Sequence, residues 1–193
     1  MKILYIVPNV DGLRNFFESG NLIDEGMPSM FNPLKRLISG GHEIAIIVYP
    51  HYNKFAKEIN LKKENLTILS LHPCKENIFL KLIRRLTFGY INIFPLIEII
   101  NFTYQIFKKI KNINFKIIYA HDNCCILLGS LMSKILGKPL IARIYGWSYM
   151  RRSGGKINLI NKIKYWDKYL PIKIKSDLCI ITKDGSVSLK ELG

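Results

Sequence analysis

The sequence predicts an α/β fold built on a doubly wound, mostly parallel sheet of about six strands. Short apolar runs typical of buried strands alternate with helical patterns along the chain. After the first strand, a helix stops at Gly40 and Gly41 and a second apolar strand begins at once. This order is a βαβ unit, whose two strands are parallel. The length of 193 residues suits one sizeable domain.

The first βαβ unit can be followed residue by residue. Residues 1–8 are almost all apolar, as in a parallel strand covered on both faces. Residues 9–28 are polar and contain several glycines, which predicts a long loop, a kind of segment that is often functional. A helix is expected over 29–39, where Pro33 is tolerated only in the first turn. The second strand covers 42–49.

A third strand is expected over 66–71, and the segment 75–113 follows it. Charged residues and Pro95 interrupt the apolar run of that segment. It therefore falls short of the ~20 clean apolar residues of a membrane-spanning helix. We expect a basic amphipathic helix, a break near Gly89 or Pro95, and a second helix to about Lys111.

Three further strands are predicted in the second half of the chain, over residues 115–120, 139–145 and 177–182. The helix between the first two spans residues 124–136, with Asp122 or Asn123 as its N-cap. Lys134 in its last turn and Gly137 just beyond are a strong stop signal.

Positive charge is the second strong feature of the chain. The 29 Lys and Arg exceed the 14 Asp and Glu, a net charge of +15. From Lys134 to Lys175 there are 11 basic residues and one acid, Asp167, a local balance of +10. A basic loop and helix are expected over 148–176, and another helix over 186–192. Because the basic residues alternate with Ile, Leu, Tyr and Trp, a membrane surface is favoured over a nucleic acid.

The four cysteines indicate neither a disulfide framework nor a metal site. Cys74, Cys124, Cys125 and Cys179 form no C-x-x-C pair and have no metal-ligand spacing. Cys124 and Cys125 lie in an apolar run and are expected to be small core residues. The chain opens on a strand and not on a signal peptide, which favours a cytoplasmic protein. We expect no metal and no other cofactor.

Candidate ligand groups follow the strand ends, where doubly wound sheets bind phosphorylated ligands. Asp11 and Gly12 follow the first strand, and Gly12 would let a phosphate approach the backbone amides. A plain turn glycine is an equal alternative. His121 follows the fourth strand, where a neutral imidazole can hydrogen-bond a sugar hydroxyl or a phosphate. For Asp122 we favour helix capping over a role in orienting His121.

An aromatic and basic group of side chains surrounds the end of the fifth strand. Its members are Trp147, Tyr149, Arg143, Arg151 and Arg152, and Tyr145 and Gly146 stand at the end of the strand itself. One interpretation is a surface rim whose long side chains cover apolar surface. The other is contact with an anionic acceptor or with lipid headgroups.

Together these segments resemble the N-terminal, acceptor-side domain of a GT-B glycosyltransferase of the family-4 type. The resembling segments are residues 1–8, 41–44, 117–122, 137–146, 177–182 and 189–193, in the family's order. The strand that opens with Gly41, His42 and Glu43 is the most specific of them. The resemblance implies a single Rossmann-like domain, one half of a GT-B fold, over residues 1–193.

The resemblance also implies an activity. The full enzyme would transfer a sugar from a nucleotide-sugar donor, with retention of configuration and without a protein-held metal, to a polysaccharide or lipid-linked glycan. His121 would lie near the transferred sugar and Gly12 near the donor diphosphate. Contacts on the acceptor side would come from Asp11, Tyr145, Gly146, Trp147, Arg151 and Arg152.

Three departures from the family pattern qualify these expectations. Gly12 stands alone where the family has paired glycines, and Tyr145-Gly146 stands where the family often has His-Gly. The family's second domain binds the sugar nucleotide with an E-x7-E motif, and the eight glutamates of this chain include no such pair. We therefore expect half of an enzyme, which lacks the donor-binding domain and is inactive alone.

Two other classes of function stay open. One is a non-catalytic basic module on a membrane surface or a partner protein, because each Lys or Arg near an anionic bilayer contributes roughly 1 kcal/mol. Such a domain would be peripheral on the inner face of the membrane. The other is half of a sugar-nucleotide epimerase with the same architecture. We expect no nucleic acid as partner.

Overall fold

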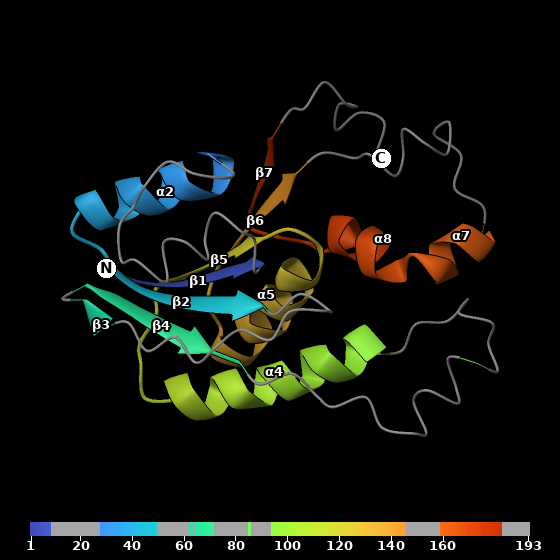
Figure 1. Cartoon of the computed structure of the whole chain (residues 1–193), viewed down its shortest axis with the longest axis horizontal. Helices are drawn as coiled ribbons and strands as arrows, with labels where there is room; N and C mark the ends of the chain where they lie inside the picture. The colour runs from blue at the N-terminus through green and yellow to red at the C-terminus, as the bar shows by residue number, and fades with distance from the viewer. Residues whose placement is uncertain are drawn as a thin grey trace.

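The computed structural model describes residues 1–8, 28–49, 62–63, 65–71, 85, 94–145 and 159–182. Its centre is a seven-stranded sheet in the order β3-β4-β2-β1-β5-β6-β7 (Figure 1). The strands are β1 (Lys2–Pro8), β2 (Glu43–Tyr49), β3 (Lys62–Lys63), β4 (Leu66–Ser70), β5 (Ile117–His121), β6 (Leu140–Tyr145) and β7 (Leu178–Thr182). Six strands pair in parallel, which confirms the predicted sheet, while β3 pairs with β4 in the antiparallel sense.

The strand order reverses next to β1. The chain proceeds from β1 to β2 and β4 on one side, and then returns to β5, β6 and β7 on the other. Open α/β sheets bind ligands at such a switch point, beyond the carboxyl ends of the strands. The carboxyl ends of β1 and β5 are therefore the place to look for a site.

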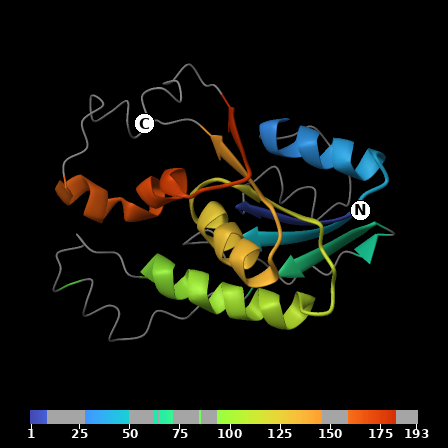
Figure 2. The ribbon, with the colours of Figure 1, turned by 180° about the vertical axis from the view of Figure 1, so that it is seen from behind.

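Helices cover both faces of the sheet. They are α2 (Pro28–Ser39), α4 (Phe94–Ile110), α5 (Asn123–Leu136), α7 (Leu159–Lys164) and α8 (Trp166–Lys173). In Figures 1 and 2, α2 lies on one face while α4 and α5 lie on the other. Helix α5 packs against both α4 and α8. The fold is thus a three-layer α/β arrangement.

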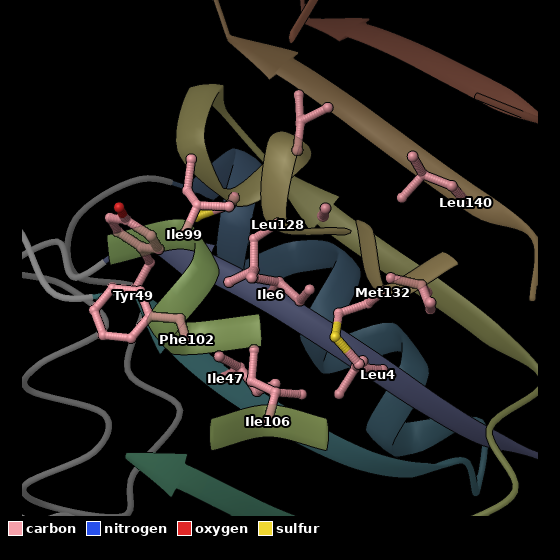
Figure 3. Packing of buried hydrophobic residues seen from close by; sticks show 14 of the residues in the cluster. Leu4, Ile6, Ile47, Tyr49, Ile99, Phe102, Ile106, Leu128, Met132 and Leu140 are labelled. Atoms are coloured by element: carbon pink, nitrogen blue, oxygen red, sulfur yellow. The ribbon is translucent and has the colours of Figure 1, made fainter. Parts of the chain in front are cut away.

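Alternation along the strands divides the buried residues between the two faces. Leu4 and Ile6 of β1 join the larger cluster, in which Phe102 and Ile106 of α4 are fully buried (Figure 3). Tyr5 lies on the opposite face, in the smaller cluster that also contains α2 residues. Successive residues of a strand point to opposite faces, so both faces of β1 are apolar and both are covered.

Close packing of α5 on β5 requires a glycine. A Cβ atom at Gly129 would lie 2.7 Å from the Cβ of Ala120 and 3.2 Å from Leu140 Cδ1. Gly129 is itself buried in the middle of α5. Its missing side chain lets the helix axis approach the sheet, which fixes the start of α5 above the end of β5.

The predicted glycine stops are confirmed, but the position of Pro33 is not. Gly41 has a φ of 70° after α2, and Gly137 has a φ of 61° and caps α5 through its amide to Ser133 O. Helix α2 begins at Pro28, so Pro33 lies inside the helix and beyond its first turn. The prediction that Pro33 occupies the first turn is wrong, because Pro28 itself takes the start of the helix, where proline is favoured.

In the two segments that were hardest to predict, one expected helix is confirmed and another is divided in two. The basic amphipathic helix expected in the first part of 75–113 lies outside the described residues, apart from Arg85. Only the second helix of 75–113 is described in full, as α4, with Pro95 in its first turn. Within 148–176 the structure has two short helices, α7 and α8, in place of one. The expected helix over 186–192 lies outside the described residues. No helix among the described residues has the length and apolar character needed to cross a membrane.

Candidate functional site

Three neighbouring strands bring five polar or aromatic side chains together on the α2 face of the sheet. They are Tyr5 of β1, Tyr119 and His121 of β5, and Arg143 and Tyr145 of β6, here called the His121 cluster. The parallel register places Tyr5 beside Tyr119 and His121 beside Arg143. His121 and Tyr145 are the last residues of β5 and β6, so this part of the cluster lies at the carboxyl ends of the strands, whereas Tyr5 and Tyr119 lie midway along theirs. The cluster is next to the switch in strand order.

His121 is the centre of this cluster and is fully buried. Its ring centroid lies 4.6 Å from that of Tyr5 and 4.6 Å from that of Tyr119. On its other side the Tyr145 ring is stacked at 5.8 Å, with 18° between the planes. The Tyr145 hydroxyl is hydrogen-bonded to His121 Nδ1 at 2.5 Å. Packing on several sides therefore holds the imidazole in one orientation.

The environment of His121 keeps its imidazole neutral. Burial, and secondarily the positive charge of Arg143, lower the pKa of His121 to about 3. A neutral imidazole has one donor nitrogen and one acceptor nitrogen. Within the part of the chain that the structure describes, Nε2 is buried and has no hydrogen-bond partner. Such a group costs about 1–3 kcal/mol, and one in a native structure requires an explanation.

Arg143 contacts Tyr119 of the neighbouring strand β5 and Tyr145 of its own strand β6. Its Nη1 donates a hydrogen bond to the Tyr119 hydroxyl at 3.3 Å, and its guanidinium carbon lies 5.6 Å from the centre of the Tyr145 ring. Burial raises the pKa of Tyr5 above its usual range, with smaller effects from Tyr119 and Tyr145. Tyr5 is therefore a neutral phenol, and Arg143 is the positive charge of the cluster.

The turn after His121 is strained. Asp122 has a φ of 64° and is the only described residue other than glycine with positive φ. Its amide donates to Arg143 O at 2.8 Å, and its carbonyl accepts from the amide of Ile126 at 2.8 Å. It occupies the N-cap position of α5, but its side chain makes no capping hydrogen bond. Asp122 thus lies at the predicted N-cap position, but its side chain does not cap the helix. Its positive φ differs from the usual conformation of an N-cap residue.

Only two of the predicted site residues lie in the described part of the chain. His121 and Tyr145 are brought into direct contact. The other six lie outside the described residues: Asp11, Gly12, Gly146, Trp147, Arg151 and Arg152. Sequence reasoning missed Tyr5 and Tyr119. The sequence places both tyrosines in apolar strands. It does not give the register between the strands, which brings the tyrosines into contact with His121.

A second polar group lies on the opposite face of the sheet. Glu98 of α4 is 3% exposed and accepts a hydrogen bond from the Tyr49 hydroxyl at 3.4 Å. Burial raises the pKa of Glu98 to about 7, although the Tyr49 hydrogen bond opposes this. Burial likewise raises the pKa of Cys124 to about 12, so its thiol stays protonated.

Two of the three described cysteines behave as core residues. Cys125 is buried and Cys124 packs against the larger cluster, as expected, whereas Cys179 of β7 is exposed. Cys74 lies outside the described residues. Among the residues that are described, no group of three His, Cys, Asp or Glu side chains could hold a metal ion.

Comparison with known proteins gives a structural likeness and no sequence match. No protein-family model and no curated protein matches the sequence. The structure is similar to that of CalG4, the calicheamicin glycosyltransferase, with a TM-score of 0.50 and 11% identity over 93% of this chain. The fold is Rossmann-like and consistent with one half of a GT-B fold.

The likeness covers only part of CalG4. The aligned region covers 47% of CalG4, so this chain spans about half the length of that protein. At this level of sequence identity the likeness concerns the fold alone. The chain is therefore glycosyltransferase-like in fold, and the chemistry has to be argued from the His121 cluster.

Proposed function

We propose that this chain is the N-terminal, acceptor-side domain of a retaining glycosyltransferase of the family-4 type. The donor would be a nucleotide sugar and the acceptor a polysaccharide or a lipid-linked glycan. The observation that carries the proposal is the neutral, buried His121 at the switch in strand order. The likeness of the fold to half of a glycosyltransferase supports it.

In this proposal His121 binds and orients a sugar. Nε2 has an unused hydrogen-bonding position but is buried, so a hydroxyl group of the transferred sugar would fill it once binding opens access to the ring. Because the pKa of His121 is about 3, the imidazole would act as a fixed neutral hydrogen-bonding group and not as a proton donor at neutral pH. Tyr145 would hold the ring in place through Nδ1.

The remaining predicted residues keep their proposed roles. Gly12 would lie near the donor diphosphate. Acceptor contacts would come from Tyr145 and from a set outside the described residues, namely Asp11, Gly146, Trp147, Arg151 and Arg152. A second Rossmann-like domain would bind most of the nucleotide sugar. The protein would work in the cytoplasm, peripherally on the inner face of the membrane, without a metal or other cofactor.

The test is an assay of the protein as its whole reading frame encodes it. The readouts are release of nucleoside diphosphate from a panel of nucleotide sugars and incorporation of labelled sugar into glycan or lipid-linked acceptors. We expect transfer with retained configuration, and a loss of roughly 10–100-fold in kcat/KM for His121→Asn, the worth of one buried hydrogen bond.

A matched control separates this role from general damage. His42→Asn changes a histidine at the amino end of β2, away from the cluster, and should keep wild-type turnover. A folded His121→Asn enzyme with unchanged kcat/KM would remove the role of His121. Interconversion of a nucleotide sugar without an acceptor would instead favour the epimerase alternative. Binding without turnover would favour the non-catalytic module.

A further inference from the structure

The outer face of α4 carries an apolar stripe that the sheet does not use. Four of its side chains, here called the α4 outer stripe, are exposed: Leu96 by 47%, Ile100 by 60%, Tyr104 by 67% and Phe107 by 43%. Spacings of four, four and three residues put them on one side of the helix. In Figures 1 and 2, α4 forms one margin of the described fold.

This stripe is additional to the buried face of the same helix. Ile99, Phe102, Ile106 and Ile110 are each at most 2% exposed and pack in the larger cluster. A helix on the surface of a globular protein normally has a polar face opposite its buried one. Helix α4 is apolar on both sides for several turns, which indicates that its outer side has a partner.

The charges around the stripe indicate the chemistry of that partner. Lys108 and Lys109 lie in the last turn of α4 and Lys111 directly follows, all three exposed. The acid of α4, Glu98, is buried on the other side of the helix against Tyr49. The stripe is thus bordered by exposed positive charge and by no exposed acid of its own helix, in a chain of net charge +15. An anionic surface complements this arrangement.

We propose that the α4 outer stripe docks this domain on an anionic lipid bilayer. The helix would lie in the plane of the interface, with Leu96, Ile100 and Phe107 in the acyl boundary and the lysines among the headgroups. Tyr104 suits the same depth, because its ring is apolar and its hydroxyl can stay hydrated. The inference rests on the peripheral membrane location in the proposed function and deepens it by naming the surface that docks. Because docking needs no sugar transfer, vesicle binding and transferase activity can fail separately.

Vesicle sedimentation with the 193-residue chain tests the proposal. Vesicles of phosphatidylcholine alone are compared with vesicles that also contain phosphatidylglycerol, at low and at high salt. We expect binding to the phosphatidylglycerol vesicles at low salt, little binding to phosphatidylcholine, and weaker binding at high salt. Ile100→Ser should weaken binding by roughly tenfold through lost apolar contact. Lys108→Gln and Lys111→Gln should each weaken it by about fivefold.

Ile135→Ser is the matched control. Ile135 is 51% exposed on α5, so the change has the same chemistry at similar exposure on another helix. It should leave vesicle binding unchanged. Equal loss in Ile100→Ser and Ile135→Ser would overturn the assignment to α4.

Two further outcomes would also overturn the proposal. One is no sedimentation with anionic vesicles at low salt. The other is a dimer that Ile100→Ser dissociates without affecting vesicle binding, which would assign the stripe to a second copy of the chain. Thermal unfolding of each variant checks that the fold is intact, as expected for exposed positions.

Discussion

The hydroxyl group of Tyr145 in β6 is hydrogen-bonded to Nδ1 of His121 in β5, and the two rings are stacked. Both residues are at the last position of their strands. The contact thus couples the carboxyl ends of two parallel strands through side chains, at the edge of the sheet where the proposed sugar site lies.

Removing this hydroxyl group should destabilise the fold. In Tyr145→Phe the ring stacking can persist, but Nδ1 of the buried His121 loses its partner, which leaves neither ring nitrogen with a hydrogen-bonding partner among the described residues. We expect a loss of about 1–3 kcal/mol in the free energy of unfolding, measured with urea. Tyr119→Phe is the control, because it removes a hydroxyl of the same cluster that bonds Arg143 and not His121. An equal or larger loss in Tyr119→Phe would contradict the importance of the His121 contact.

The stability of the fold should fall on acidification because of His121. Its folded-state pKa of about 3 lies below the ordinary value of 6.5, so the unfolded chain binds the proton first. The contribution of His121 to the free energy of unfolding is complete above its pKa in the unfolded chain. It decreases as pH falls toward its pKa in the folded protein. The slope approaches about 1.4 kcal/mol per pH unit. Urea unfolding at a series of pH values should give a smaller slope for His121→Asn than for the wild type. Parallel curves would contradict the burial of a neutral imidazole.

Glu98 should have the opposite pH dependence. Its folded-state pKa of about 7 lies above the ordinary 4.5, so the folded protein holds the proton more tightly. Its contribution is complete below the unfolded pKa and is lost as pH rises through the folded pKa. As pH rises from 4.5 to about 7, the free energy of unfolding of Glu98→Gln should therefore increase relative to that of the wild type, by an amount on the order of 2 kcal/mol. The same pH series measures it, and a constant difference between the two proteins would exclude titration of Glu98 in this range.

The contact between α5 and β5 should not tolerate a methyl group. Gly129→Ala places a Cβ at 2.7 Å from Ala120 Cβ and should cost about 1–3 kcal/mol, although alanine favours the helix itself. Ala120→Gly in the same chain removes the other atom of the clash. In a double-mutant cycle, Ala120→Gly should lower the free energy of unfolding less in the Gly129→Ala protein than in the wild type. Additive effects would mean that the two atoms do not meet.

Much of the fold was predictable because its signals are local. The apolar run of β1, the glycine stops at Gly41 and Gly137, and the alternation of strands with helices depend on neighbouring residues, and all are confirmed. The prediction for Pro33 was wrong because α2 begins at Pro28, whereas the prediction relied on the pattern further along the helix. The two-residue strand β3 was missed because so short a segment has no periodicity of its own.

The candidate site was predictable only in part. The position of His121 at a strand end could be inferred, because in parallel sheets the carboxyl ends of the strands share one edge. The sequence does not show that the ring is fully buried, neutral and in contact with Tyr145. The same holds for Tyr5, whose strand is far from β5 in the sequence but adjacent to it in the sheet.

The sequence by itself determined the class of the fold, the order of its main elements and the position of His121 at the carboxyl end of a strand. The tertiary structure decided the register that joins Tyr5, His121 and Tyr145, and the exposure of Ile100 on α4. The physical reason is the range of the interactions. Helix stops and strand patterns arise from contacts between near neighbours, whereas register and burial depend on packing between segments that only the folded sheet brings together.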